Sequence, residues 1–194
     1  MKRPPLSLKG QALALLSRRE HSRAELRNKL LAHARKRAQA AAEELARAAA
    51  LGPRDPWDRL EADPPDLAGA ASPGATFDAE AAREEIERLL DELEAARHLS
   101  DARFAESRVH ARAKRQGTSR IRQELARHGV ELDAETARHL RETELERARA
   151  VWQRKYGGAI AADPADRARQ MRFLAARGFA AEVVRRVVGG RDDD

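Results

Sequence analysis

The chain has 194 residues, with 38 Lys and Arg against 32 Asp and Glu, which gives a formal net charge of +6. Cysteine is absent, so disulfides, thiolate metal sites and a cysteine nucleophile are excluded. Aromatic residues make up 4% of the chain and charged residues 36%, which favours small helical interfaces over one thick core. No apolar run is long enough to cross a membrane and no apolar signal segment follows Met1, so we expect a cytoplasmic location.

Basic residues are concentrated in two sections of the chain. Residues 1–37 carry a net charge of +9 and residues 100–130 carry +5, whereas residues 38–76 and 77–99 carry −4 and −5. Two basic sections separated by acidic ones indicate a surface that meets a polyanion or an acidic protein. Because arginine is abundant throughout, solvated helix faces explain the same pattern.

The first predicted helix runs from about Leu8 to Arg19. Its expected buried residues are Ala12, Leu13 and Leu16. A capping box at residues 22–25 starts a second helix, which the Ala-rich stretch 35–51 is able to prolong. Five prolines between residues 52 and 75 then indicate a flexible linker.

The clearest helical pattern of the chain lies between Asp78 and Arg97. Four apolar residues follow the i, i+3, i+4, i+7 spacing of one buried stripe, namely Ile86, Leu89, Leu90 and Leu93. Ser100 or Asp101 caps the next helix, and Gly117 ends it. The inward residues of that helix are Phe104, Ala105 and Val109.

A short helix follows, with Thr118 or Ser119 as its expected cap and Gly129 as its left-handed last residue. Asp133 starts a third helix of this unit. The last unit repeats the plan with a helix that stops at Gly157, a helix with Pro164 in its first turn, and a closing helix rich in valine.

One short core recurs along the chain. In residues 124–130 and 173–179 a leucine stands four positions before a glycine, and an apolar residue follows the glycine. A first copy begins alike, with Leu26 and Leu30 four residues apart, but an inserted segment starts at Ala34 where the glycine is expected. Repeats with a period of about fifty residues are typical of helical arrays.

These patterns predict an all-α protein, an elongated array of three tandem three-helix repeats. The expected repeats are residues 1–99, interrupted by an insert at about 35–76, then 100–143 and 144–190. Residues 191–194 are expected to form a disordered acidic tail. We expect a monomer.

Three stretches resemble the RecX family, the regulatory proteins of the RecA recombinase. Residues 14–26 (ALLSRREHSRAEL) resemble its N-terminal signature. Residues 99–105 (LSDARFA) and 120–125 (RIRQEL) resemble its central signature, and residues 172–179 (RFLAARGF) its C-terminal one. The resemblance covers everything except the insert and the tail.

The resemblance implies a fold and a function. Members of the family consist of three tandem three-helix units in an elongated, curved molecule. They bind RecA, lie along the groove of the RecA–DNA filament, and suppress ATP hydrolysis, strand exchange and coprotease activity. By blocking filament extension or promoting disassembly, they restrain recombination and the SOS response.

Enzyme classes find little support in the residues. The six histidines are scattered, and none forms the i, i+4 pair with an adjacent carboxylate that is typical of a helical metal site. No phosphate-binding Gly-rich loop is present. We therefore expect no catalytic residue, no metal and no cofactor.

The candidate contacts to RecA or DNA are two sets of cations. The first set contains Arg108, Arg112, Lys114, Arg115, Arg120 and Arg122, of which three fall at helical steps of four and three residues. The second set contains Arg18, Arg19, Arg23 and Arg27. Either set is also explained by a solvated face, and the second set has neighbouring carboxylates with which to pair.

The favoured hypothesis is a non-enzymatic regulator that binds RecA and RecA–DNA filaments. The alternative is a direct binder of single- or double-stranded DNA, since a three-helix unit with a basic middle helix also resembles a helix-turn-helix. A helical scaffold for another protein is the third hypothesis. DNA binding without RecA separates the second from the first.

Overall fold

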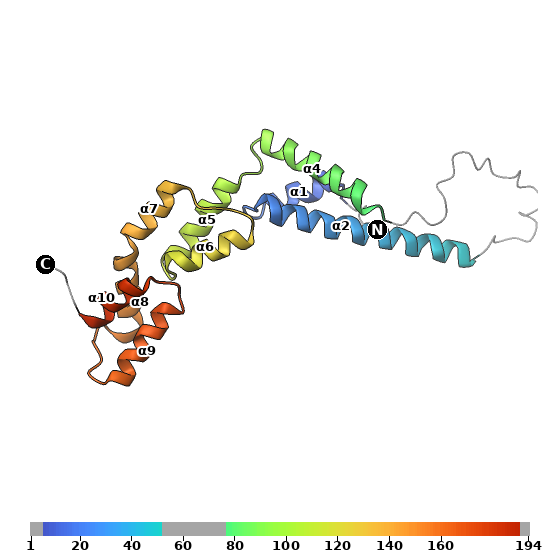
Figure 1. Ribbon diagram of the computed structural model, residues 1–194. Helices are drawn as coiled ribbons and strands as arrows, with labels where there is room; N and C mark the ends of the chain where they lie inside the picture. Colours follow the sequence, from blue (N-terminus) through green and yellow to red (C-terminus); the bar gives the residue numbers. More distant parts are fainter. Residues whose placement is uncertain (1–5, 52–76, 191–194) are drawn as a thin grey trace, which may run out of the picture. The chain divides into compact units, whose positions relative to one another are not determined.

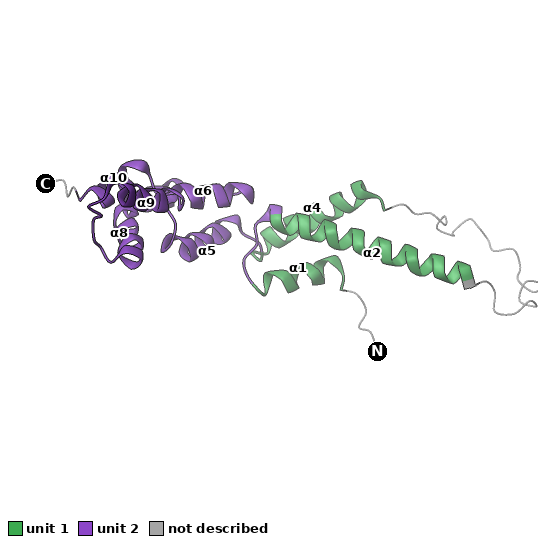
Figure 2. Cartoon of the chain, turned by 90° about the horizontal axis from the view of Figure 1, so that it is seen from below, with its two compact units in different colours: residues 1–18, 25–98 green, residues 19–24, 99–194 purple. Residues whose placement is uncertain are grey.

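The computed structural model describes residues 6–51 and 77–190, and every regular element in these ranges is an α-helix (Figure 1). This confirms the predicted all-α class. The chain divides into two compact units, residues 1–18 with 25–98 and residues 19–24 with 99–194 (Figure 2). The predicted linker at 52–75 and the acidic tail at 191–194 lie outside the described residues.

The first unit contains α1 (Leu8–Leu16), most of α2 (Arg23–Leu51) and α4 (Ala79–Ala95). The predicted stripe of α4 is confirmed, because its four apolar residues are at most 8% exposed. Three expectations for α1 were wrong: it ends at Leu16, Leu13 is 39% exposed, and Leu16 is only partly buried. Adjacent residues point about 100° apart on a helix, so when Ala12 faces inward its neighbour lies toward solvent.

The helix α2 continues through Ala34, the position where the later repeats turn. The beginning of the predicted insert is therefore helical as far as Leu51. This stretch stays helical because alanine has the highest helix propensity, although its side chains are mostly exposed, as at Leu45 (58%).

The second unit begins with α5 (Asp101–Ala113), α6 (Thr118–Arg127) and α7 (Ala134–Glu142). The expected caps Ser100 and Asp133 are confirmed, since their side chains accept the backbone N–H groups three residues ahead. One buried cluster joins the three helices: Phe104, Ala105, Ile121, Leu125, Val130 and Leu140. Val109 packs against it and is partly buried.

Three further helices complete this unit, α8 (Glu144–Tyr156), α9 (Pro164–Ala175) and α10 (Ala181–Gly189). Their cluster consists of Ala148, Val151, Trp152, Leu174, Phe179, Val184, Val187 and Val188. The indole N–H of Trp152 donates to the side-chain oxygen of Gln170 at 2.9 Å, so the one polar atom of the indole is satisfied although buried.

The recurring leucine–glycine core forms the same turn twice. Gly129 and Gly178 have φ of +70° and +81°, the left-handed region that the sequence pattern predicts. In both turns the leucine four residues earlier is fully buried, and its carbonyl accepts the N–H of the apolar residue after the glycine. These bonds satisfy carbonyls that a helix end would leave unpaired.

The turn between α5 and α6 packs directly on the turn between α9 and α10. The N–H of Gly117 donates to the carbonyl of Arg177 at 2.9 Å, and that of Ser119 donates to the carbonyl of Gly178 at 3.3 Å. A Cβ at Gly117 would lie 2.2 Å from the Gly178 oxygen. The expected cap at Thr118 or Ser119 was therefore wrong, because Gly117 takes the N-cap position to permit this approach.

A buried polar network holds the same joint. The carboxylate of Glu144, 5% exposed, accepts the N–H of Thr118 at 2.9 Å. The guanidinium of Arg147 donates to the carbonyls of Gln116 (2.7 Å) and Leu140 (2.6 Å). Burial lowers the pKa of Arg147 and the Glu144 charge opposes this, but arginine titrates so high that it stays protonated.

Candidate functional site

Two arginines of the first predicted set, the cations between residues 108 and 122, lie against one acid. Arg112 Nε is 3.0 Å from Glu124 Oε2, and Arg108 Nη1 is 3.6 Å from Glu124 Oε1. The guanidinium of Arg108 also lies 5.0 Å from the centre of the Phe104 ring. These two cations therefore tie α5 to α6 within one three-helix unit, a structural contribution that sequence periodicity alone did not distinguish.

Lys114 and Arg115 lie in the exposed turn that follows α5. Neither side chain forms a hydrogen bond or ion pair with another residue in the described part of the chain. Their charges are thus available to a ligand, and Arg115 borders a cavity.

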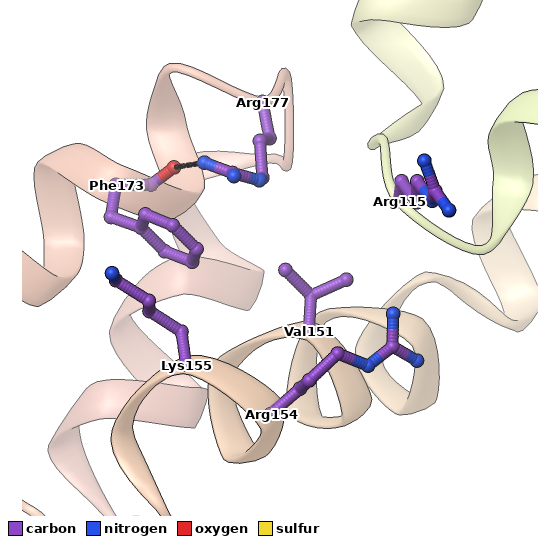
Figure 3. Close-up of a pocket in the computed structure, with 6 residues that line it drawn as sticks. All are labelled: Arg115, Val151, Arg154, Lys155, Phe173 and Arg177. Atoms are coloured by element: carbon purple, nitrogen blue, oxygen red, sulfur yellow. Dashed lines mark hydrogen bonds between the residues drawn. The ribbon is translucent and has the colours of Figure 1, made fainter.

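This cavity has a volume of about 220 Å³ and lies beside the joint between the two three-helix clusters of the second unit (Figure 3). We call it the joint cavity. Its lining residues are Arg115, Val151, Arg154, Lys155, Phe173 and Arg177. Four of the six are cations and none is an acid, so the electrostatic potential inside is positive.

Arg177 is held in place above an aromatic ring. Its guanidinium carbon lies 3.7 Å from the centre of the Phe173 ring, and its Nη1 donates to the Phe173 carbonyl at 3.3 Å (Figure 3). The ring is packed edge-on against Tyr156, with centroids 5.3 Å apart. The stacked pair presents a planar cation at the cavity wall.

The sequence prediction included Arg115 but missed Arg154, Lys155 and Arg177. Each of these precedes a glycine turn by one to three residues, at Gly157 or Gly178. Basic residues at helix C-termini are ordinary, so this signal points first to the helix dipole. Only the packing of one turn on another brings the three cations to Arg115.

The remaining residues of this set diverge. Arg120 is packed at its base against Gly178, whose Cβ, if present, would lie 2.5 Å from the Cβ of Arg120. Arg122 lines a separate hollow of about 270 Å³ together with Glu131. The six predicted cations of this set therefore have different surroundings and do not form one contact surface by themselves.

The second predicted set, the four arginines between residues 18 and 27, is divided between the two units. Arg18 and Arg27 belong to the first unit, and Arg19 and Arg23 to the second. Arg27 forms a bidentate ion pair with Glu87 of α4. Its Nε donates to Oε1, and its Nη2 donates to Oε2 at 3.2 Å. Arg27 therefore joins α2 to α4.

The other members of this set make contacts inside the second unit. The side chain of Arg19 donates to the carbonyl of Glu20 at 3.0 Å, and the backbone N–H of Arg23 donates to the Asp101 carboxylate at 2.8 Å. The structure does not assemble the four arginines into one surface within either unit.

In the part of the chain that the structure describes, no three His, Asp or Glu side chains gather closely enough to hold a metal ion. No described helix combines the length and the apolar composition needed to cross a membrane.

The helices, the two three-helix clusters and the joint cavity define a helical-repeat protein with a cationic site where two repeats meet. Models of the second and third three-helix domains of RecX match residues 100–134 and 142–188. The chain belongs to the RecX family, as relatives along nearly its whole length show.

One of these relatives is the regulatory protein RecX of Ralstonia nicotianae, 41% identical over 192 residues, which cover 98% of this chain and 91% of the relative. The regulatory protein RecX of Leptothrix cholodnii is 42% identical over 188 residues, 96% of this chain and 90% of the relative. That of Pseudomonas putida is 34% identical over 194 residues, 98% of this chain and 94% of the relative. The resemblance seen in the sequence is thereby confirmed.

Proposed function

We propose that this chain regulates RecA by binding RecA and the RecA–DNA filament. By binding it inhibits ATP hydrolysis, strand exchange and coprotease activity, and so restrains recombination and the SOS response, without catalysing a reaction of its own. The observation that carries the proposal is the similarity, over nearly the full chain, to relatives named regulatory protein RecX. The family resemblance supplies RecA as the partner.

The proposal includes three repeats as the binding body. The helices α1, α2 and α4 form the first repeat within residues 1–99, followed by repeats at 100–143 and 144–190. Support for the first repeat comes from its own buried residues on all three helices, including Ala12, Leu26 and Leu90, each 0% exposed. A repeat protein offers much contact surface for its volume, which suits a filament partner.

The cations of the exposed turn after α5 are the proposed contacts. Lys114 and Arg115 have no partner among the described residues, so no internal ion pair must break when they bind. Arg112 keeps Glu124 in place and contributes less to binding than its charge suggests. Contacts of this kind to phosphates or acidic groups weaken as salt rises.

The proposal is tested by co-sedimentation with RecA filaments assembled on single-stranded DNA. The triple variant Arg112→Ala, Lys114→Ala, Arg115→Ala is expected to bind more weakly while keeping the native circular dichroism spectrum. A control with the same loss of charge is Lys9→Ala, Arg138→Ala, Arg169→Ala, which removes exposed residues that already pair with nearby acids. Unchanged binding of the folded triple variant would contradict the assigned contacts.

A wild-type chain that fails to sediment with filaments at low salt would contradict the function itself. Sedimentation with naked DNA alone, and none with RecA, would support the alternative of a direct DNA-binding protein instead.

A further inference from the structure

The joint cavity has four cations and no acid among its six lining residues. A single cation on a solvated helix face is ordinary, but Arg115, Arg154, Lys155 and Arg177 line one cavity from three elements. Neighbouring like charges repel each other, and at exposed side chains solvent screens part of that repulsion. Within the described residues no acid lines this cavity, so an external anion is the natural counter-charge.

The size of the cavity limits what the anion can be. Its volume of about 220 Å³ is below the roughly 300 Å³ at which pockets for drug-sized molecules begin. It therefore suits one group of a larger ligand. Planar guanidinium groups match the oxygens of a phosphate in pairs, and the lysine adds a point charge.

The aromatic wall favours nucleic acid over an acidic peptide. Beside the cations stand the Phe173 ring and the Arg177 guanidinium stacked on it at 3.7 Å. Unstacked bases lie on aromatic rings and on arginine planes, and this stacking is what single-strand binding sites add to a positive groove. A carboxylate of a peptide gains nothing from such a surface.

The joint holds these groups in position before any ligand arrives. The N–H of Gly117 donates to the carbonyl of Arg177, which fixes the turn that carries Arg115 beside Arg177 itself. Arg147 holds the same turn through the carbonyl of Gln116. A site that is already formed loses less entropy on binding.

We propose that the joint cavity binds a phosphate group of single-stranded nucleic acid, with an adjacent base stacked at Arg177. This goes beyond the proposed action on RecA, because the site needs no RecA to form. It also assigns a binding role to Arg154, Lys155 and Arg177.

The test is fluorescence anisotropy of a labelled single-stranded oligonucleotide of mixed sequence, titrated with the full chain over a series of salt concentrations. The variant Arg154→Ala, Lys155→Ala is expected to bind at least tenfold more weakly at low salt. Since the cavity takes one phosphate, and each phosphate contact contributes about 0.7 to the slope of log K against log salt for single strands, the slope should fall by about 0.7. Both side chains are exposed, so the variant should fold normally.

The matched control is Arg138→Ala, Arg169→Ala, which has the same net charge as the test variant. Both control residues are exposed and pair with acids on their own helices. The control should bind like the wild type. A third variant, Arg177→Lys, keeps the charge and removes the planar group, so it should weaken binding with little change in the salt slope.

Three outcomes would overturn the proposal. They are no binding of the wild type at the lowest salt, an equal loss in the test and control variants, and a loss in the test variant for an acidic peptide of matched charge but not for the oligonucleotide. Because RecA is absent from the assay, each outcome leaves the proposed action on RecA to its own test.

Discussion

The two units use their cations differently. In the first unit, basic side chains lie against acids of the same unit: Lys9 with Glu92 at 3.3 Å, Lys29 with Glu25 at 3.8 Å, and Arg27 with Glu87. The second unit contains such pairs too, for example Arg112 with Glu124 and Arg169 with Asp166, but it also has four cations that line the joint cavity, whose lining includes no acid.

The charge alternation along the sequence therefore has two causes. The acidic section 77–99 largely forms α4, whose carboxylates meet cations of α1 and α2 from the basic section 1–37. That part of the pattern is complementarity inside a unit. The basic section 100–130 has few acids. Glu124 pairs with both Arg108 and Arg112, so Arg115 has no acid of this section to pair with and is available to a ligand.

The largest expected effect is on the joint that positions the cavity. Gly117→Ala places a Cβ 2.2 Å from the carbonyl oxygen of Gly178. The atoms that it meets belong to the backbone, so no change of side-chain rotamer relieves the clash. We expect the free energy of unfolding to fall by about 3 kcal/mol. Urea denaturation followed by circular dichroism measures it.

The control for this variant is Gly189→Ala, in the last turn of α10, where an added Cβ meets nothing within 4 Å. It should leave stability within about 1 kcal/mol of the wild type. Equal stability of the two variants would show that the two turns do not need their close approach.

The next effect concerns the polar network of the joint. Arg147→Ala removes the guanidinium donor from the carbonyl of Gln116 and one of the two side-chain donors from that of Leu140, and it leaves Glu144 buried without its counter-charge. We expect a loss of about 2 kcal/mol in the free energy of unfolding. Thermal denaturation, with Arg138→Ala as the exposed control, measures it, and a loss no larger than the control's would disprove the network's contribution.

A smaller effect is expected from the pair that joins α2 to α4 in the first unit. Arg27 and Glu87 are each 38% exposed, so solvent screens their attraction. A double-mutant cycle with Arg27→Ala and Glu87→Ala should give a coupling energy of up to about 1 kcal/mol, decreasing with salt. Binding to the oligonucleotide should be unchanged. A clear loss of that binding in Arg27→Ala would mean that the first unit also supplies ligand contacts.

The smallest effect is expected from removing the insert. Deletion of residues 38–76, replaced by a short Gly-containing turn, removes the mostly exposed end of α2 and should leave the protein folded and active. The melting temperature and the inhibition of RecA both test this. A collapse of the melting temperature would show that the deleted residues contribute to the packing of the first unit.

Local patterns made much of the fold predictable. The stripe of α4, the caps at Ser100 and Asp133, and the turns at Gly129 and Gly178 follow from spacing and from backbone chemistry within a few residues. These features depend on neighbours in the sequence, so the sequence carries them directly.

The features that could not be predicted from the sequence are contacts between residues far apart in the chain. The sequence pattern predicts that Gly117 ends a helix. In the structure a side chain is excluded at Gly117 because the backbone of Gly178, sixty-one positions further along the chain, lies against it. The pairing of Arg112 with Glu124 was not foreseen, since it joins two helices. The joint cavity exists only because two repeats pack together, so periodicity within one helix could not reveal it.

The most direct test of the central claim is ATP hydrolysis by the cognate RecA on single-stranded DNA, titrated with this protein at low and high salt. If the protein regulates RecA as proposed, it inhibits hydrolysis at well below one protein per RecA, and less at high salt because the contacts are ionic. Hydrolysis that continues unchanged at both salt concentrations, even with this protein in excess over RecA, would contradict it.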